Sequence, residues 1–352
     1  MSAAPYAVGI IGCGGMGRSH ARVYDAVDAT EVVAAVDMNP DAVAAFAEEH
    51  GTEAYESHEE MLAAEHLDVV SICTWHSTHA RLAVDACEAG VDGIVLEKPM
   101  ATNMGETWDI LDAVERNDVN LIVSHQRRHD PVHERMRELV GEGAIGDPQL
   151  IRVGYRAGLL NWGTHLIDLG RYVMDDPAPA WVSGHVERRT DRYERQLPIE
   201  DACTGVIAFE NGARLVIEMD VPEPDVTDTR VQIYGSRGVG EVELGTAATV
   251  TNVDGTVEHT PTQEWGTRRA MIEEFVELLD GDRDAHRCAG TGAADVMEIM
   301  MGLYESARRR EVIEFPLETR ANPLDLLIEK ELPPEYPGAY DIRLPYQSLR
   351  ED

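Results

Sequence analysis

Lys98 is the residue of this chain whose type and setting point most directly to chemistry. It is one of only two lysines among 30 basic residues, and it stands in Glu97-Lys98-Pro99 directly after the apolar run 93–96. An arginine stays protonated at any workable pH, whereas a lysine exchanges a proton once burial and neighbouring charges shift its pKa. We therefore predict a catalytic role for Lys98, against the alternative of a surface lysine with no chemical task.

His165 is the second candidate. It lies in the segment 161–168, Asn-Trp-Gly-Thr-His-Leu-Ile-Asp, which we expect to open a helix. His165 and Asp168 are three residues apart and so share one helical face, with Asn161 about one turn earlier. The alternative is a helix-capping Asn161 followed by a buried structural histidine–aspartate pair. The chain has no HExxH motif, no cysteine cluster and no second histidine at ligand spacing here, so we expect no metal.

A glycine-rich loop indicates a nucleotide site near the start of the chain. Gly12-Cys13-Gly14-Gly15-Met16-Gly17 matches GxGxxG between a strand-like run and a helical segment. In that setting the first glycine makes the tight turn, the second lets the backbone approach a pyrophosphate, and the third allows close packing of helix on strand. The alternative is an ordinary glycine-rich turn.

Asp37 follows Gly17 by about 20 residues, at the end of the second expected strand. A carboxylate at this place accepts hydrogen bonds from both ribose hydroxyls of a dinucleotide. Its neighbours Met38 and Asn39 offer no cation for a 2′-phosphate, so the pattern favours NAD over NADP. The alternative is a strand-terminal aspartate with a structural role.

Two further polar segments follow expected strands. The run 74–79, Thr-Trp-His-Ser-Thr-His, ends one strand, and Glu97-Lys98-Pro99 ends the next. Ligands of open parallel sheets bind at the carboxyl ends of the strands, so both segments and the glycine loop should border one crevice. His79 is more often a structural hydrogen-bonding residue than a catalyst at such a place, and Trp75 either stacks near the cofactor or packs on a helix.

The elements that position these residues follow from hydrophobic periodicity. Up to residue 125, short β-branched runs alternate with amphipathic segments, which predicts a doubly wound parallel Rossmann sheet with right-handed crossovers. The expected strands are 7–11, 32–36, 69–73, 93–96 and 121–124, and the expected helices are 18–27, 41–50, 58–64, 78–89 and 105–116.

After about residue 146 the pattern changes to longer alternating strands, at 149–155, 181–188, 203–210, 214–221, 230–235 and 239–244. This predicts an α+β domain with a large, mostly antiparallel open sheet, one face covered by its own helices and the other available to a partner. Helices are expected at 268–279 and 293–310, and the proline-rich tail from residue 316 should wrap the surface. We place the domains at 1–125 and 126–352.

Length and charge bound the class of protein. A chain of 352 residues is long enough for two domains. Its net charge of −35, from 65 acidic and 30 basic residues, argues against nucleic acid or an anionic membrane surface as a partner. The hydrophobic fraction of 43% indicates a folded protein rather than a disordered acidic chain. An acidic shell of this kind is typical of a cytoplasm with molar salt.

The five cysteines show no CxxC spacing, and several lie in or beside apolar runs, as expected of buried thiols in a reducing compartment. The N-terminal segment lacks the pattern of a signal peptide, and no apolar run approaches the length of a membrane span. We therefore expect a cytoplasmic protein.

These motifs together resemble the Gfo/Idh/MocA family, which includes glucose–fructose oxidoreductase and inositol dehydrogenases. The resemblance covers roughly residues 6–315. Its matching segments are the 12–17 loop, 74–79, Ala89-Gly90 leading to Glu97-Lys98-Pro99, Arg127-Arg128-His129-Asp130-Pro131, 163–168, Asp201, 209–212 and 234–238.

The resemblance implies an NAD-dependent oxidoreductase acting on a secondary hydroxyl of a sugar, inositol, related polyol or sugar acid. It implies catalytic roles for Lys98 and His165 beside the reacting hydroxyl, and substrate contacts from Arg127, Tyr155 and Asn161. Family members also commonly form dimers or tetramers through the open sheet. The implied cofactor-binding residues are Gly12, Cys13, Gly14, Gly15, Met16, Gly17, Asp37, Met38, Thr74, Trp75, His76, His79, Glu97, Lys98 and Gln126.

Within that scheme we expect His165 to be the base that takes the hydroxyl proton, because an imidazole titrates near neutral pH. Lys98 would hydrogen-bond the same oxygen and stabilise the charge that develops on it. The two roles can be exchanged.

Three departures from the family pattern affect the substrate site. Asn161 stands where an acidic residue is usual, four positions before the histidine, and Trp75-His76 replaces the usual Pro-Asn. The stretch 155–161 is also shorter than usual. Two other functions therefore stay open: tightly bound NAD used for elimination or epimerisation without net redox change, and a non-catalytic NAD-binding regulatory protein.

Overall fold

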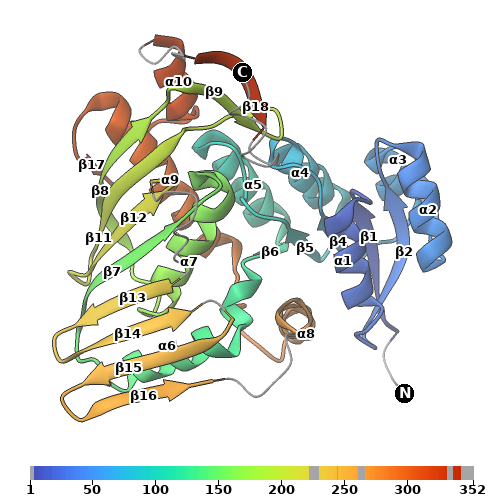
Figure 1. Cartoon of the computed structure of the whole chain (residues 1–352). Helices are drawn as coiled ribbons and strands as arrows, with labels where there is room; N and C mark the ends of the chain where they lie inside the picture. Colours follow the sequence, from blue (N-terminus) through green and yellow to red (C-terminus); the bar gives the residue numbers. More distant parts are fainter. Residues whose placement is uncertain (1–3, 222–229, 244, 261–265, 331–335, 342–352) are drawn as a thin grey trace. The chain divides into compact units, whose positions relative to one another are not determined.

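The computed structural model describes residues 4–221, 230–243, 245–260, 266–330 and 336–341, which form two compact units (Figure 1). We call them the N-terminal and the C-terminal unit. The described residues up to Thr102, with Glu106–His129 and Gly266–Ala294, make the N-terminal unit, and the other described residues make the C-terminal unit. Within the described residues, no helix has both the length and the apolar character that a bilayer span requires.

The N-terminal unit is built on a six-stranded sheet in the order β3-β2-β1-β4-β5-β6, in which every pairing is parallel. This strand order is that of the Rossmann fold. Strands β1 to β3 are added toward one edge of the sheet and strands β4 to β6 toward the other, so the order of addition reverses between β1 and β4. The strands are β1 (Tyr6–Ile11), β2 (Thr30–Val36), β3 (Glu53–Tyr55), β4 (Val69–Ile72), β5 (Gly93–Leu96) and β6 (Asn120–Val123).

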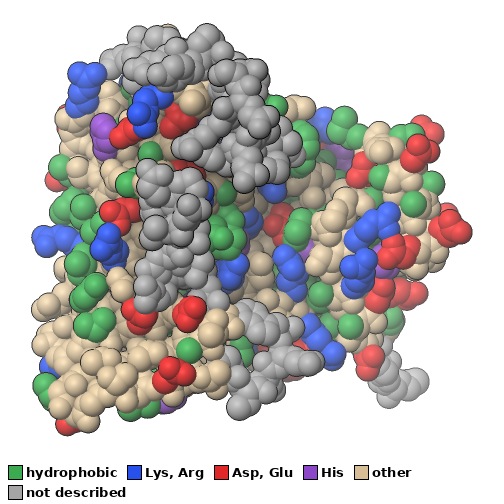
Figure 2. Space-filling view, viewed as in Figure 1, with side chains coloured by type: hydrophobic (Ala, Val, Ile, Leu, Met, Phe, Trp, Pro, Cys, Tyr) green, Lys and Arg blue, Asp and Glu red, His purple; other side chains and the backbone are tan. Residues whose placement is uncertain are grey.

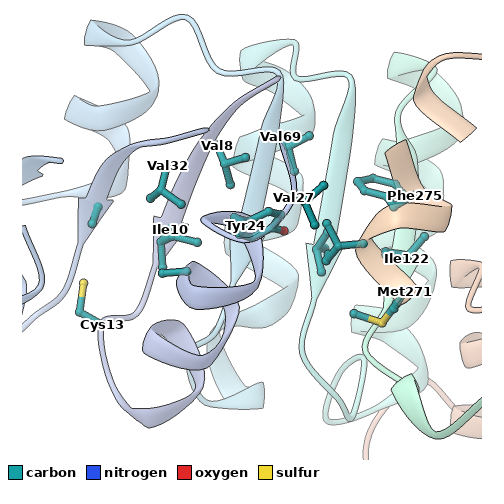
Figure 3. Close-up of a cluster of buried hydrophobic side chains, with 14 of the residues drawn as sticks. Val8, Ile10, Cys13, Tyr24, Val27, Val32, Val69, Ile122, Met271 and Phe275 are labelled. Carbon is teal, nitrogen blue, oxygen red and sulfur yellow. The ribbon is translucent and has the colours of Figure 1, made fainter. Parts of the chain in front are cut away.

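Helices lie on both faces of this sheet. Val8 and Ile10 of β1 belong to a buried cluster that also takes in Tyr24 and Phe275 (Figure 3). The intervening residue of β1, Gly9, faces Met61 on the opposite side, as the alternation of a strand requires. The helices are α1 (Gly15–Tyr24), α2 (Pro40–His50), α3 (His58–Ala64), η1 (His76–Thr78), α4 (His79–Ala89), α5 (Met104–Asn117), η2 (Gln126–His129) and α8 (Thr267–Leu279).

The C-terminal unit contains a nine-stranded sheet in the order β16-β15-β14-β13-β7-β12-β11-β8-β17. The β7–β12 pair is parallel and the other pairs are antiparallel. The strands are β7 (Pro148–Tyr155), β8 (Pro179–Glu187), β11 (Ala202–Phe209), β12 (Arg214–Met219), β13 (Arg230–Gly235), β14 (Gly238–Glu243), β15 (Ala247–Asn252), β16 (Gly255–His259) and β17 (Ile313–Glu314).

Helices cover one face of the nine-stranded sheet. Leu215 and Ile217 of β12 are buried beneath them, whereas Arg152 and Glu218 on the alternate face form an exposed ion pair with Nη2 and Oε2 2.7 Å apart. The helices are α6 (Pro131–Gly141), η3 (Gly158–Gly163), α7 (Thr164–Tyr172), α9 (Gly290–Arg309) and α10 (Pro323–Lys330). A small second sheet has the order β10-β9-β18, from β10 (Leu197–Pro198), β9 (Thr190–Glu194) and β18 (Tyr336–Asp341).

The structure confirms the predicted fold class and most predicted elements within a few residues, and it corrects others. Helix α1 begins at Gly15 and so starts inside the glycine loop, whereas the prediction began at residue 18. The short strands β3, β9, β10, β15, β16, β17 and β18 were not predicted, because they lack a clear apolar alternation. The expected wrapping tail forms α10 and β18 where it is described, and Leu244, the end of a predicted strand, lies outside the described residues.

The division into units also differs from the predicted boundary after residue 125. Residues 126–129 and Gly266–Ala294, which the sequence analysis places in the second domain, pack with the N-terminal unit. The reason is that α8 supplies Met271, Ile272 and Phe275 to the buried cluster of the Rossmann sheet. A single boundary in the sequence cannot describe a unit to which a later segment of the chain returns.

Candidate active site

The glycine loop has the shape that a dinucleotide requires. Gly12 has φ +98°, a conformation that favours glycine, and a Cβ on Gly17 would lie 1.9 Å from the Gly12 carbonyl oxygen. A side chain at Gly17 would therefore force the loop apart. No heavy atom lies within 4 Å of the positions a Cβ would take on Gly14 or Gly15, so this part of the loop faces open space at the start of α1. These residues fit a bound pyrophosphate.

Asp37 is fixed against this loop. Its Oδ2 accepts a hydrogen bond from the Cys13 amide at 2.7 Å, and its Oδ1 accepts one from the Asn39 amide at 2.9 Å. Met38 is 98% exposed beside it. Burial, together with the charge of Asp37, raises the pKa of the Cys13 thiol to about 12. The Cys13 thiol therefore stays protonated. Each oxygen of the Asp37 carboxylate accepts one backbone amide and still has a lone pair for a ribose hydroxyl.

The loops after β4 and β5 are held together by His79. Its Nδ1 lies 3.0 Å from the Pro99 carbonyl oxygen and its Nε2 lies 3.2 Å from the Thr74 carbonyl oxygen. Burial lowers the pKa of His79, so the ring is neutral at physiological pH and donates its one proton to one of these carbonyls. His79 thus has the structural role that the sequence analysis considers, and it fixes the two loops that carry Thr74 and Lys98.

The other residues of the 74–79 segment differ in exposure. Trp75 is 41% exposed, whereas His76 is buried. The Thr74 hydroxyl lies 2.7 Å from the Thr78 hydroxyl, which also donates to the Trp75 carbonyl oxygen at 2.9 Å. A partly exposed indole at the carboxyl end of β4 can stack on a flat ligand.

Glu97 is buried and directed into the N-terminal unit. Its Oε1 lies 3.0 Å from His20 Nε2, and its Oε2 accepts a hydrogen bond from the Lys98 amide at 3.2 Å. Burial acts to raise the pKa of Glu97, but the hydrogen bond and charge of His20, with Lys98 and Arg268, lower it to about 2. The carboxylate is therefore ionised, and sequence reasoning did not find its partner His20.

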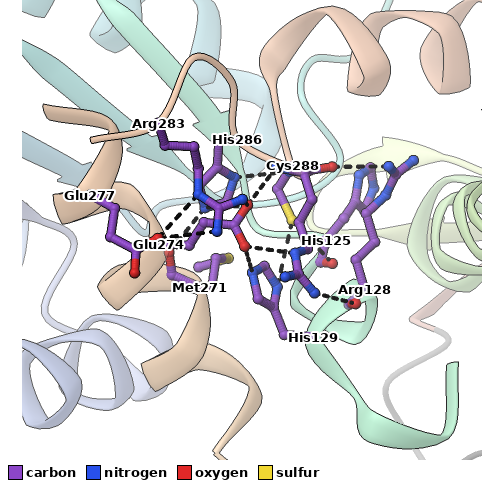
Figure 4. A network of polar contacts seen from close by, with 10 residues as sticks. His125, Arg128, His129, Met271, Glu274, Glu277, Arg283, His286 and Cys288 are labelled. Atoms are coloured by element: carbon purple, nitrogen blue, oxygen red, sulfur yellow. Dashed lines mark hydrogen bonds and ion pairs between the residues drawn. The ribbon is translucent and has the colours of Figure 1, made fainter. Parts of the chain in front are cut away.

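Gln126 and Arg127 lie in η2, which follows β6 and is fixed by a buried polar network (Figure 4). Glu274 of α8 lies at its centre. Its Oε2 lies 3.2 Å from His129 Nε2 and forms an ion pair with Arg287 Nε at 2.6 Å, and its Oε1 accepts a hydrogen bond from the Arg287 amide at 2.8 Å. These contacts tie η2 to α8.

His286 completes this network. Its Nε2 donates to the Met271 carbonyl oxygen at 3.0 Å, and its Nδ1 accepts from the Cys288 amide at 2.9 Å. Burial lowers the pKa of His286 to about 4. Burial acts to raise the pKa of Glu274, but the contacts from His129, Arg287 and His286 lower it to about 2. The network therefore contains a neutral His286 and an ionised Glu274.

Two groups of described side chains bring three possible metal-ligand atoms within 4.8 Å of one another. In the first group, His129, Glu274 and His286, the Nε2 proton of His286 is directed at a carbonyl and Arg287 contacts the carboxylate. The second group is His58, Glu59 and Asp85, in which the imidazole nitrogens lie 2.9 Å and 2.7 Å from the two carboxylates. In both groups the possible ligand atoms are already in contact with other protein groups.

The candidate residues of the C-terminal unit gather at η3 and α7. Asn161 lies inside η3, a π-helical turn, and the N-cap of α7 is Gly163, so the helix-capping interpretation of Asn161 is wrong. His165 and Asp168 are both buried in α7, as are the other residues of this helix. Segments of π-helix are frequent at functional sites because they change which side chains a helix presents.

Two carboxylates that the sequence analysis missed hold the start of η3. Asp220 accepts hydrogen bonds from the amides of Ala157 at 3.1 Å and Gly158 at 2.8 Å. Glu200 accepts from the Leu159 amide at 2.6 Å and from the Tyr304 hydroxyl at 2.6 Å. Burial raises the pKa of Glu200. No local sequence motif marks Glu200 or Asp220, because the groups that they contact lie far away in the chain, up to 104 positions for Glu200 and Tyr304.

Three rings adjoin one another beside this turn. The ring centroids of Tyr155 and Trp162 are 4.2 Å apart, and those of Trp162 and His165 are 5.8 Å apart with an edge-on arrangement. The predicted residues Tyr155 and His165 are thus linked through Trp162. Such a row of rings suits the apolar face of a sugar or a cyclic polyol.

The comparisons with known proteins agree with both units. Residues 6–125 match the oxidoreductase family with an NAD-binding Rossmann fold, and residues 156–241 match the GFO/IDH/MocA C-terminal domain. The chain belongs to the GFO/IDH/MocA family. As a GFO/IDH/MocA protein it is an oxidoreductase whose cofactor is NAD, and its glycine loop and Asp37 fit that cofactor.

Among its relatives is inositol 2-dehydrogenase 3 of Saccharopolyspora erythraea, which is 29% identical over 300 residues, or 82% of this chain and 87% of that protein. The D-apiose dehydrogenase of Paraburkholderia graminis is 26% identical over 269 residues, or 70% of each chain. A levoglucosan dehydrogenase solved with NADH and levoglucosan has the same fold, with a TM-score of 0.79, 21% identity, and coverage of 89% of this chain and 100% of that one.

Proposed function

We propose that this GFO/IDH/MocA protein oxidises a secondary hydroxyl of a sugar, an inositol, a related polyol or a sugar acid, with reversible reduction of NAD. The observation that carries the proposal is Lys98 at the carboxyl end of β5. Lys98 follows β5, the glycine loop follows β1 and Asp37 follows β2, and these three parallel strands belong to one sheet. Inositol and D-apiose dehydrogenases among the relatives support this substrate class.

NAD, when bound, supplies the carbon that accepts or returns the hydride. His165 takes the proton of the hydroxyl group as the carbonyl forms, and Lys98 donates a hydrogen bond to the same oxygen and stabilises its charge. The two roles are interchangeable, since either group can hold a proton near neutral pH in a suitable setting. Backbone amides of the glycine loop hold the pyrophosphate, and Asp37 accepts from the ribose hydroxyls.

Arg127, Tyr155 and Asn161 bind the substrate in this proposal, and we add Trp162 to them. The Tyr155–Trp162 pair presents an aromatic surface next to His165. Arg127 belongs to η2, which the Glu274 network holds in place. Asn161, held in η3, offers an amide that donates and accepts hydrogen bonds, as a ring bearing several hydroxyls requires.

The preference for NAD over NADP rests on the charge of Asp37. Its carboxylate accepts from ribose hydroxyls and repels a 2′-phosphate, and Met38 next to it adds no cation.

Asn161 also favours a second candidate, a regulatory NAD-binding protein without turnover. An amide cannot exchange a proton as the usual acid does. The retained Lys98 and His165 weigh against this candidate. The third candidate function is elimination or epimerisation with tightly bound NAD. Release of one NADH for each substrate molecule oxidised would exclude it.

The test is a screen of inositols, aldoses and sugar acids with NAD in high salt, followed through the absorbance of reduced nicotinamide. We expect turnover with at least one cyclic polyol or sugar. Lys98→Met and His165→Ala should each lower turnover by roughly 100-fold or more while leaving NAD affinity nearly unchanged. Lys98→Arg should fail as well, because a permanently charged, broader group cannot replace a compact ammonium. Near-normal turnover in both Lys98→Met and His165→Ala would rule out these roles.

We propose self-association through the open face of the nine-stranded sheet as a further property. Arg152 and Glu218 lie on that face together with the half-exposed Leu150. Light scattering of the purified protein should give the mass of a dimer or a tetramer, and a monomer at working concentration would contradict this.

A further inference from the structure

A buried polar group underlies the backbone of Lys98 in the N-terminal unit. It consists of His20 on α1, Ser71 on β4 and Glu97 after β5. His20 is 2% exposed and Glu97 is 6% exposed. His20 Nδ1 lies 2.9 Å from Ser71 Oγ, and its Nε2 lies 3.0 Å from Glu97 Oε1. The imidazole therefore joins the first helix after the glycine loop to the segment that carries Lys98.

The second oxygen of Glu97 extends this connection to Lys98 itself. Glu97 Oε2 accepts a hydrogen bond from the Lys98 amide at 3.2 Å. One carboxylate thus contacts an imidazole on one side and the Lys98 backbone on the other. Both side chains are buried, which strengthens these contacts relative to exposed ones.

The charges of the pair depend on each other. Burial acts to lower the pKa of His20, but its contacts with Cys73 and Glu97 raise it above the usual range. Glu97 is ionised, for the causes given above, and it faces Lys98 and Arg268 as well as His20. An imidazolium and a carboxylate in contact have no net charge. Without His20, the ammonium of Lys98 would be close to a buried carboxylate whose main counterion had gone.

We propose that His20 and Glu97 are positioning residues for Lys98: the pair fixes its backbone at the end of β5, and His20 offsets the negative charge that Glu97 would otherwise exert on the Lys98 ammonium. The consequence is that Lys98 can give up a proton more readily than it could beside an unpaired carboxylate. This inference rests on the proposed function for its relevance to turnover, but the effect on Lys98 can be measured without a substrate.

The composition of the chain makes that measurement direct. Only Lys98 and Lys330 are lysines, so a Lys330→Arg background labelled with isotopic lysine has a single side-chain NMR signal, that of Lys98. In this background we would compare the titration midpoint of Lys98 in the parent, in His20→Gln, in Glu97→Gln and in the double variant. His58→Gln is the matched control, because His58 is also a buried histidine in contact with a carboxylate, with Nε2 2.7 Å from Asp85 Oδ2.

We expect His20→Gln to raise the midpoint of Lys98 by roughly one pH unit, because Glu97 then acts on the ammonium without compensation. Glu97→Gln and the double variant should stay within about 0.3 units of the parent: without Glu97 the buried His20 becomes neutral, so neither variant has a net charge at this pair. His58→Gln should cause no change. Recovery in the double variant is the result that a merely structural role would not produce. An unchanged midpoint in His20→Gln, or equal shifts in His20→Gln and the double variant, would overturn the proposal.

If His20→Gln does not fold, Glu97→Gln still decides the matter, because a downward shift of more than one unit in that variant would mean that the native pair carries a net negative charge at Lys98. Melting temperature and NAD affinity identify variants that are folded. Turnover separates this proposal from the proposed function. Near-normal turnover in Lys98→Met would remove the catalytic role of Lys98, whereas the NMR titration would still report whether His20 offsets Glu97.

Discussion

At the scale of single residues, the cofactor end of the site depends on one carboxylate. Asp37 is oriented by the amides of Cys13 and Asn39, which contact its two oxygens at 2.7 Å and 2.9 Å. These two hydrogen bonds fix the carboxylate of Asp37 at the end of β2. Met38 beside it is almost fully exposed and is the natural place for a competing cation.

Replacing Asp37 with Ser and Met38 with Arg should narrow or reverse the preference for NAD over NADP. The substitution removes the repulsion of a 2′-phosphate and adds a guanidinium that binds it. Titration of parent and variant with both cofactors measures the ratio, and Met38→Arg alone shows how much comes from the added cation. Stronger binding of NADP than NAD by the parent would contradict this account.

Asn161→Asp tests whether the site is built around the amide. Asn161 lies in a turn whose start is already held by two carboxylates, Glu200 and Asp220. A third carboxylate adds like charge and removes a hydrogen-bond donor, so we expect the KM for substrate to rise several-fold and by more than kcat falls. Asn161→Gln, which keeps the amide, is the control. Unchanged or improved kcat/KM in Asn161→Asp would mean that the site only tolerates the amide.

At the scale of elements, the contact between η2 and α8 depends on ionisation. Glu274 has a folded-state pKa of about 2 against 4.5, and His286 has one of about 4 against 6.5. Both values are lowered on folding, so the unfolded chain binds more protons than the folded chain as the pH falls from about 6.5 to about 2. Both groups therefore stabilise the fold at neutral pH and lose this contribution on acidification.

We expect His286→Gln to flatten the acid side of the stability profile. The variant lacks the group that must be protonated on unfolding between pH 6.5 and 4, so the free energy of unfolding should fall by about 3 kcal/mol less than in the parent across that range. At neutral pH the variant should be less stable than the parent, because Gln fills the buried position less well. Chemical denaturation at several pH values measures both effects, and parallel profiles would contradict the prediction.

At the scale of the whole molecule, 65 acidic residues against 30 basic ones give a net charge of −35. On the face seen in Figure 2, acidic side chains lie dispersed among basic and uncharged ones. A net charge of this size repels itself when little salt is present.

Stability should therefore increase with salt. Screening at molar ionic strength shortens the Debye length to about 3 Å and weakens this repulsion. We expect the melting temperature to rise steadily from dilute buffer to molar KCl, with the same rise in NaCl if screening is the cause. A flat or falling curve would defeat the interpretation of the composition as an adaptation to high salt, although not the fold or the family.

The sequence by itself determined the Rossmann sheet, the glycine loop, Asp37 and the Glu97-Lys98-Pro99 segment. Each depends on residues close together in the chain: alternation and helical periodicity act over a few positions, and a loop between a strand and a helix takes its shape from its own glycines. The positions of Lys98 and Asp37 at strand ends followed from that local order.

Only the tertiary structure decided what surrounds these residues. The partner of Glu97 is His20, 77 positions earlier, and the segment that carries His129 is held by Glu274, 145 positions later. The start of η3 depends likewise on Asp220, more than 60 positions away. No local pattern records such pairs, because burial and hydrogen-bond geometry, which select a partner for a buried charge, exist only once distant segments have packed.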